Sequence, residues 1–453
     1  MERKKIVGFV ALGEVNTPIE KLWEKHDMAL KAISFDDCDV IDAGLVIDDA
    51  KYETADAAVA KLQARPFDVL VLCVCGWIPT HAVIRVTDEF RHMPMLLWGL
   101  CGWREKNGKI VTTAEQAGTT ALRPTLQELG YNFKFVYNMI DHDMPMDVIH
   151  DYITAASAVK QLRKMRVGTM GYRDMLLYGT QYEGFSMRRD IGIEVEPYEM
   201  LEMVRAMDTL DPAAVQEEVD YIKKNWVMET PADDSIIEQG VRYALAIGKK
   251  IEERGWNAIT LIDVDGMKKL EGFPPAMVFM IIGRRYNIPT TPENDVMGNV
   301  TQIIAQLLTG QCAHYMEYYE FFPKSVLIGV PDYIPEGVTK GDVHVMSVAF
   351  GLLNASLLNV SKCNDGRVTC VRLLYTGGQY KLHMYTGTAK QPQPWNEYGW
   401  DDPAPQLVSL EVEMDSPVEE FADKVGCQHV IVTYGDNRRV FEDWAKIMGI
   451  EVI

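Results

Sequence analysis

Short apolar runs alternate with amphipathic, helix-like runs along the first part of the chain. The apolar runs are rich in Val, Leu and Ile, and we interpret them as buried strands. Strand–helix alternation of this kind predicts a parallel, doubly wound sheet. The predicted strands are Lys5–Ala11, Asp39–Gly44, Asp68–Cys75 and Met95–Leu100, and the predicted helices are Lys21–Ile33, Ala55–Ala64 and Thr113–Glu128.

A second unit of similar design is predicted after the helical stretch Met146–Lys164. Met165–Tyr172 has the pattern of a new first strand and turn, and an apolar helix is expected at Val300–Thr309. Both features indicate a second α/β domain. The segment Met175–Arg189 follows that turn without an assigned element type. Further strands are predicted at Gly192–Pro197 and Asn257–Val264, and further helices at Asp211–Asn225, Asp234–Arg254 and Pro275–Tyr286.

From about Lys324 the pattern changes to short strand-like runs separated by tight turns. Asn364-Asp365-Gly366 and Gly377-Gly378 are hairpin signals, so a mostly antiparallel, barrel-like β domain is expected. The predicted strands are Ser325–Val330, Asp342–Ala349, Ala355–Asn364, Arg367–Tyr375, Gln379–Gly387, Gln406–Met414 and His429–Tyr434, before a helix at Phe441–Met448. The predicted fold class is α/β, with two doubly wound domains at 1–163 and 164–323 and the β-rich domain at 324–453.

Composition excludes several classes of partner. A formal net charge of −20 argues against nucleic acid and against an anionic membrane surface, since both require a basic face. The apolar run after Met1–Lys5 is too short for a spanning helix or a signal peptide, so we expect a cytosolic protein. The eight cysteines form no Cys-x-x-Cys pair, which predicts free, buried thiols.

Three residues are candidates for chemistry: Glu293 in Pro292-Glu-Asn-Asp295, Glu317 in an aromatic run, and His429 at the start of a predicted strand. Two carboxylates and an imidazole suit a hard divalent cation with open positions. Each residue also has an ordinary interpretation. The Glu-Asn-Asp run can cap the next helix, Glu317 can face solvent, and His429 can be a strand histidine.

The spacing of these residues resembles that of the L-fucose isomerase family. Leu308-Thr309-Gly310 ends the apolar helix, Glu317 follows that glycine by seven residues, and 24 positions separate the two acids. Gly426–Gly435 resembles the family segment that bears a metal histidine, and residues 292–319 are also similar to L-arabinose isomerases. The resemblance implies an aldose–ketose isomerase that binds Mn²⁺, Co²⁺ or Mg²⁺ through Glu293, Glu317 and His429.

In that interpretation Glu293 and Glu317 also move the proton, while Asp295 supports the site or binds a sugar hydroxyl. The resemblance further implies a homo-oligomer, trimer or hexamer, in which the first domain of a neighbouring subunit completes the pocket. The substrate would be a deoxy- or sulfo-hexose such as L-fucose or sulfoquinovose, or a pentose. The predicted sugar-binding residues besides Asp295 are Trp77, His81, Arg85 and Trp400.

The chain also departs from the family. Asp263–Gly266 replaces a Gln-rich polar stretch, and Gly13–Asn16 lacks the family's arginine, so the residues that select the sugar are less defined than the metal ligands. Arg85, Arg188 and Arg189 are considered as receptors for an anionic substituent, with surface charges as the alternative. A cytosolic sugar-binding protein without catalysis and a metal-dependent sugar epimerase or aldolase are the alternative functions.

Overall fold

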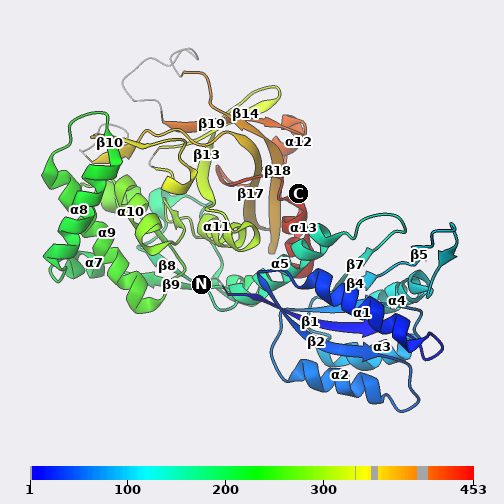
Figure 1. The fold of residues 1–453 in the computed structure, drawn as a ribbon. Coiled ribbons are helices and arrows are strands. Elements are labelled where there is room, and N and C mark those ends of the chain that lie inside the picture. Colours follow the sequence, from blue (N-terminus) through cyan, green and yellow to red (C-terminus); the bar gives the residue numbers. More distant parts are fainter. Residues whose placement is uncertain (1–2, 332, 348–355, 395–406) are drawn as a thin grey trace. The chain divides into compact units, whose positions relative to one another are not determined.

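The computed structural model describes residues 3–331, 333–347, 356–394 and 407–453. The chain divides into two compact units, described one at a time below (Figure 1). The first unit comprises Met1–Gln161 and Glu442–Gly449, and the second comprises Leu162–Phe441 and Ile450–Ile453. The predicted division into three domains with limits at 163 and 323 stays a prediction. No helix in the described ranges has the length and apolarity that crossing a bilayer requires.

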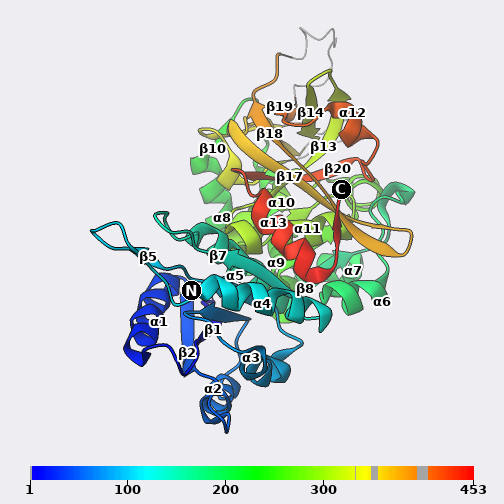
Figure 2. The same cartoon turned by 90° about the vertical axis from the view of Figure 1, so that its right-hand side faces the viewer.

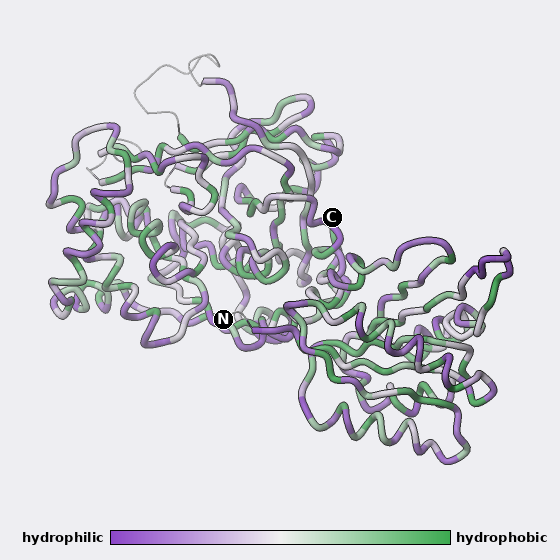
Figure 3. Tube along the Cα trace, in the orientation of Figure 1, coloured by the Kyte–Doolittle hydropathy of each residue, from purple (hydrophilic) through white to green (hydrophobic). Residues whose placement is uncertain are grey.

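The first unit is a five-stranded parallel sheet in the order β2-β1-β3-β4-β7. Every residue of β3 is buried, because helices cover both faces of a doubly wound sheet. Hydrophobic stretches accordingly follow its central strands in Figure 3. The strands are β1 Lys5–Leu12, β2 Cys38–Val46, β3 Val69–Val74, β4 Met95–Gly99 and β7 Phe133–Tyr137. The helices are α1 Ile19–Ile33, α2 Glu53–Gln63, α3 Thr80–Thr87, α4 Glu115–Glu128 and α5 Met146–Leu162, and β5 Trp103–Arg104 pairs with β6 Ile110–Val111.

The second unit begins with a four-stranded parallel sheet in the order β12-β11-β8-β9. Its strands are β8 Arg166–Met170, β9 Glu194–Tyr198, β11 Ala258–Leu261 and β12 Thr290–Thr291. The longer helices of this part are α7 Met200–Met207, α8 Pro212–Asn225, α9 Asp234–Arg254, α10 Ala276–Tyr286 and α11 Val296–Thr309. The sequence thus correctly predicted two parallel α/β sheets.

The segment Met175–Arg189, which has no predicted element type, does not form one continuous helix. The chain instead forms a 3₁₀ turn η2 at Asp174–Leu176, a short α6 at Gly184–Ser186 and a π-helical turn η3 at Met187–Ile191. No α-helix can begin at Met175, because Met175 and Leu176 have left-handed backbone angles, φ 46° and 58°. The strand predicted to reach Val264 also ends early, at Leu261, and the π-helical turn η4 Asp263–Lys268 follows it.

The rest of the second unit contains a closed antiparallel β-barrel of six strands, which confirms the predicted barrel-like domain (Figure 2). Its order is β17-β20-β13-β14-β19-β18, and pairing of β18 with β17 closes it. Gly377 and Gly378, both with positive φ, form the two-residue turn between β17 and β18. The strands are β13 His314–Phe321, β14 Ser325–Val330, β17 Gly366–Thr376, β18 Gln379–Lys390, β19 Val408–Met414 and β20 His429–Tyr434.

A small sheet of β10 Trp226–Met228, β15 Val343–Ser347 and β16 Leu357–Asn359 lies outside the barrel order. Because β16 pairs with β15, Asn364-Asp365-Gly366 does not join two paired strands, and that hairpin prediction is wrong. The chain ends with α12 Val418–Ala422, α13 Arg438–Met448 and the short β21 Glu451–Val452, which pairs with β18. All eight cysteines are free thiols; five are buried, whereas Cys101 and Cys427 are half-buried and Cys312 is exposed.

His314 on β13 is fully buried and stays neutral. Neither ring nitrogen has a hydrogen-bond partner among the described residues, and the ring stacks on Tyr434 with centroids 5.8 Å apart. Burial lowers the pKa of His314 to about 3. A histidine with a folded-state pKa below that of the unfolded chain, about 6.5, lowers stability wherever the unfolded chain takes up the proton.

The effect of His314 on stability therefore appears below a pH of about 6.5 and is absent at neutral pH. Acidification from pH 7 to pH 5 is expected to cost about 2 kcal/mol through this residue. His314→Phe, which keeps an aromatic ring beside Tyr434, should reduce the pH dependence of urea unfolding by that amount. Substitution of the exposed His92 by Phe is the control, and equal pH dependence in both variants would contradict the assignment.

Candidate metal centre

Glu293, Glu317 and His429 come together in the second unit from three different elements. Glu317 lies on β13 and His429 is the first residue of β20, and the two are register partners in adjacent strands. Glu293 lies in the connection from β12 to α11, at the edge of the parallel sheet where such folds bind ligands. One ligand atom from each residue lies within 4.8 Å of the other two. The structure therefore places the three predicted ligands at one point.

The orientation of His429 fits a cation. Its Nδ1 lies 2.7 Å from Asp295 Oδ2, and because a carboxylate only accepts, Nδ1 must carry a proton. In the neutral ring the Nε2 lone pair then faces Glu293 Oε2, 3.0 Å away, and neither of these buried atoms has a hydrogen-bond partner in the part of the chain that the structure describes. Two lone pairs face each other favourably only when a proton or a metal lies between them. The donor set of two carboxylates and one imidazole matches a divalent ion such as Mn²⁺.

The surroundings of His429 favour positive charge at Nε2. Burial opposes the charged ring, but the nearby carboxylates of Asp295 and Glu293, together with Cys427, outweigh it and raise the pKa of His429 well above its usual value. Either a proton or a metal ion at Nε2 supplies this positive charge, and a metal ion displaces the proton when it binds.

Asp295 supports His429 from behind and also caps α11. Its carboxylate accepts hydrogen bonds from Gly298 N at 2.9 Å and from Arg372 Nη1 and Nη2 at 2.6 and 2.9 Å. Burial alone would raise the pKa of Asp295, but Arg372 and His429 hold it far below its ordinary range. Both oxygens are thus engaged within the chain. This favours the role of Asp295 in positioning His429 over a contact with a sugar hydroxyl. The same carboxylate both caps α11 and positions His429, so the two roles do not exclude each other.

Glu293 is held in a strained backbone conformation. Glu293 and Asn294 have φ of 59° and 49°, which side-chain-bearing residues rarely adopt. Asp263 Oδ1 accepts a hydrogen bond from Glu293 N at 2.6 Å, and Asn294 is bonded through its side chain to Thr169 and to the carbonyl of Tyr172. Strain of this kind persists where surrounding contacts fix it, and such positions cluster at functional sites.

Sequence reasoning missed four residues around the ligands. Arg372, only 2% exposed, neutralises Asp295, and the signal for it was a lone charge in the apolar run Cys370–Leu374. In the sequence, Asp263 was noted only because it departs from the family pattern. Lys268 is buried, and its Nζ lies 3.4 Å from Asp263 Oδ2. The ring of Tyr315 lies 4.6 Å from that of His429, and burial together with Glu293 and Glu317 raises the pKa of its phenol, which stays protonated.

Cys427 adds a second possible group of ligands with Asp295 and His429. Its thiol donates to Gly179 O at 3.5 Å and accepts from His429 N at 3.5 Å. Burial opposes the thiolate, but Arg372 and His429 outweigh it and lower the pKa of Cys427. Because both oxygens of Asp295 are already bonded, the group with Glu293 and Glu317 is the better metal site.

The predicted sugar-binding residues Trp77, His81 and Arg85 belong to the first unit. Trp77 follows β3 and is half-buried, and the His81 ring packs edge-on against Tyr52 with centroids 5.7 Å apart. Arg85 donates to Asp56 at 2.7 Å. Trp400 lies outside the described residues. A role of these residues in binding a sugar stays a prediction.

The other two arginines considered for an anionic group are bound within the chain. Arg189 makes two hydrogen bonds to Asp190, at 2.6 and 2.7 Å. Arg188 donates to the carbonyls of Gly192 and Arg163 and lies 3.6 Å from Glu194. With Arg85 on Asp56, all three guanidinium groups already face a carboxylate, which favours the surface-charge interpretation.

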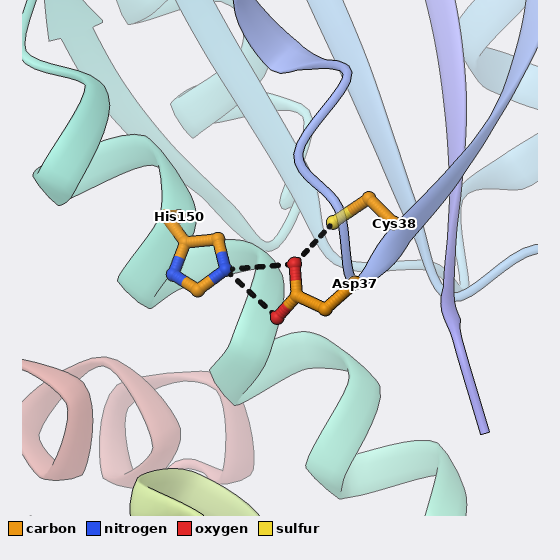
Figure 4. Close-up of side chains that lie close together, drawn as sticks. All are labelled: Asp37, Cys38 and His150. Carbon is orange, nitrogen blue, oxygen red and sulfur yellow. Dashed lines mark hydrogen bonds and ion pairs between the residues drawn. The ribbon is translucent and has the colours of Figure 1, made fainter. Parts of the chain in front are cut away.

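A third group of possible ligands, Asp37, Cys38 and His150, lies in the first unit (Figure 4). His150 Nε2 lies 3.0 and 3.1 Å from the oxygens of Asp37, and Lys5 forms an ion pair with the same carboxylate. Burial raises the pKa of the Cys38 thiol to about 12. A protonated thiol and a carboxylate already neutralised by Lys5 favour an ion-pair cluster that links α5 to β1 over a metal site.

No family model matches the chain, and no curated protein sequence matches it. Among solved structures, an ABC transporter solute-binding protein from Bacillus halodurans with bound myo-inositol shares 12% identity at a TM-score of 0.18, over 69% of this chain and 91% of that one. Another, from Agrobacterium vitis with bound alpha-D-tagatopyranose, shares 13% identity at a TM-score of 0.17, over 73% of this chain and 92% of that one. Likenesses at these scores carry no argument about the function.

Proposed function

We propose that this chain is a metal-dependent aldose–ketose isomerase. The observation that carries the proposal is the convergence of Glu293, Glu317 and His429, with the unbonded His429 Nε2 facing Glu293 Oε2 at 3.0 Å. These residues would hold Mn²⁺, or Co²⁺ or Mg²⁺ in its place. The sequence resemblance to L-fucose isomerases supports the same assignment independently of the geometry.

An ion held by Glu293, Glu317 and His429 would supply Lewis-acid chemistry, which makes the C–H bond next to a carbonyl group more acidic. The chain supplies the proton transfers. A carboxylate oxygen of Glu293 or Glu317 takes the proton from C2 of the aldose and a carboxylic acid returns it to C1, while the hydrogen of the O2 hydroxyl moves to O1. Atoms balance, since the ketose is an isomer of the aldose. His429 serves as a ligand only, because Asp295 and Arg372 fix its ring.

We also propose a class of substrate, a cellular location and an oligomeric state for the enzyme. The substrate is a deoxy- or sulfo-hexose or a pentose, and the protein acts in the cytosol, where eight free thiols are stable. A homo-oligomer, trimer or hexamer, in which a neighbouring subunit contributes Trp77, His81 or Arg85 to the pocket, follows from the family resemblance.

The test is turnover of an aldose panel in D₂O, followed by NMR. The purified chain is stripped with a chelator, reloaded with Mn²⁺ and offered deoxy-, sulfo- and pentose aldoses, with Glu293→Gln and Glu317→Gln as inactive controls. Ketose carrying deuterium at C1 or aldose carrying deuterium at C2 is expected. Activity that survives both substitutions contradicts the assigned roles. Epimerised or cleaved products would identify an epimerase or aldolase, and sugar binding without turnover, unchanged by chelation, would identify a binding protein.

A further inference from the structure

The segment Tyr172–Thr180, which follows β8, is bonded at both ends to the residues around the candidate metal centre. The carbonyl of Tyr172 accepts a hydrogen bond from Asn294 Nδ2 at 2.7 Å, one residue after Glu293. The carbonyl of Gly179 accepts from Arg372 Nη2 at 3.1 Å and from the Cys427 thiol at 3.5 Å. Both ends of the segment therefore lie beside residues that adjoin or support the candidate ligands.

The middle of this segment is fixed by Asp174. Asp174 is fully buried, and its carboxylate accepts from the backbone N of Val264 and of Asp265, both at 2.8 Å. Asp265 in turn accepts from Met175 N at 2.9 Å. These bonds hold Met175 and Leu176 in the left-handed region. That conformation is unfavourable for residues with a side chain, and local contacts must offset its free-energy cost. These bonds thus fix the backbone of the segment around Met175.

The side chains that it presents are aromatic, apolar and cationic. Tyr172, Leu176 and Tyr178 are 59, 65 and 80% exposed. The guanidinium of the half-buried Arg173 lies 4.3 Å from the centre of the Tyr178 ring, a cation–π contact. Within the described ranges no carboxylate pairs with Arg173, in contrast to Arg85 and Arg189. In a chain with a net charge of −20, a positioned arginine without a carboxylate is available to a ligand.

We propose that Arg173, positioned by Tyr178, binds an anionic substituent of the sugar at a carbon remote from C1 and C2. The inference rests on the proposed isomerase function and narrows its substrates to anionic aldoses. A planar guanidinium binds a sulfonate, phosphate or carboxylate through two parallel hydrogen bonds. The exposed faces of Tyr172 and Tyr178 supply flat surfaces for the C–H groups of the sugar.

The experiment compares anionic aldoses with their neutral counterparts on the Mn²⁺-loaded chain. The pairs are 6-deoxy-6-sulfoglucose with 6-deoxyglucose, glucose 6-phosphate with glucose, and glucuronate with glucose, and they distinguish the three anions. At least one anionic member is expected to have the higher kcat/KM. Arg173→Gln is expected to raise KM for that member by about 10- to 100-fold, leaving the neutral member unchanged, because charged hydrogen bonds contribute on this scale. Arg173→Lys should restore part of the affinity, and Arg189→Gln is the matched control.

The outcomes separate the inference from the function that it rests on. Equal kcat/KM for anionic and neutral members, or no effect of Arg173→Gln on any anionic member, overturns the anion subsite and leaves the isomerase standing. Absence of turnover for every aldose contradicts the isomerase. In that case calorimetric binding of 6-deoxy-6-sulfoglucose and of glucose 6-phosphate decides the subsite by itself. Weaker binding to Arg173→Gln supports it, and equal or absent binding in both proteins refutes it.

Discussion

The Glu317→Gln variant is expected to bind Mn²⁺ more than about 100-fold more weakly than the wild-type chain and to lose isomerase activity. A carboxamide keeps the size of the side chain but is neutral and a weaker ligand, so the ion would retain Glu293 as its one anionic ligand in this group. Even a residue that merely supports a ligand contributes about 10- to 100-fold to metal affinity, and a direct ligand contributes more. Titration with Mn²⁺ followed by the electron paramagnetic resonance signal of the free ion measures the affinity without reference to activity.

Glu320→Gln is the matched control for this titration. Glu320 lies on the same strand, β13, but is exposed, and it is not one of the clustered ligand atoms. Its substitution removes the same charge from the chain and should leave Mn²⁺ affinity unchanged. Wild-type affinity in Glu317→Gln would remove Glu317 from the metal site, whereas equal loss in both variants would show that net charge, and not ligation, determines binding.

Elements with a strong and uninterrupted pattern were predictable from the sequence. Asp234–Arg254, Ser325–Val330 and His429–Tyr434 have the limits that their periodicity predicts, because each buries one consistent face or run. The strand β13 was missed since its eight residues, His314–Phe321, mix aromatic and charged side chains without apolar alternation. It is a strand because β14 and β20 pair with it on both sides, a tertiary contact that local pattern does not reveal.

The irregular conformation at the start of Met175–Arg189 was unpredictable for a comparable reason. The composition of this segment suits a helix, but the buried Asp174 binds the backbone of the distant Val264 and Asp265 and holds the next residues in the left-handed region. Local propensity is a weak preference that such contacts override. This irregular segment lies next to the candidate site, where conflict between local preference and tertiary structure is expected.

The candidate ligands were predictable from spacing, whereas their supports were not. Glu293 and Glu317 lie close in sequence and follow one landmark, Leu308-Thr309-Gly310. Arg372 reaches Asp295 across 77 positions, and the two meet only because α11 packs against a barrel that closes between β17 and β18. Although β17 and β18 form a local hairpin, the barrel also requires the pairing of β20 with β13 and with β17. Those pairings are distant in sequence, so no short pattern reports them.

Arg372→Met is expected to destabilise the second unit by about 3–5 kcal/mol, because it leaves the carboxylate of Asp295 buried without its main counter-charge. The pair is fully enclosed, with side-chain exposures of 2 and 0%, so solvent screens little of the interaction. Hydrogen exchange of peptides from β17 and β20 measures the loss where it arises. Arg367→Met is the control on the same strand: Arg367 pairs with Asp415 near the surface, and its loss should cost about 1 kcal/mol or less.

A second substitution shows whether the loss of stability in Arg372→Met is electrostatic. Asn at position 295 keeps the cap of α11 but has no charge, so Asp295→Asn in the Arg372→Met background should recover part of the lost stability. The same Asp295→Asn change in the wild-type background should destabilise, since it leaves Arg372 as the uncompensated charge. This non-additivity is the signature of a coupled buried pair. Additive effects, or equal losses for Arg372→Met and Arg367→Met, would mean that Arg372 acts through packing alone, and that the orientation of His429 does not depend on a charged support.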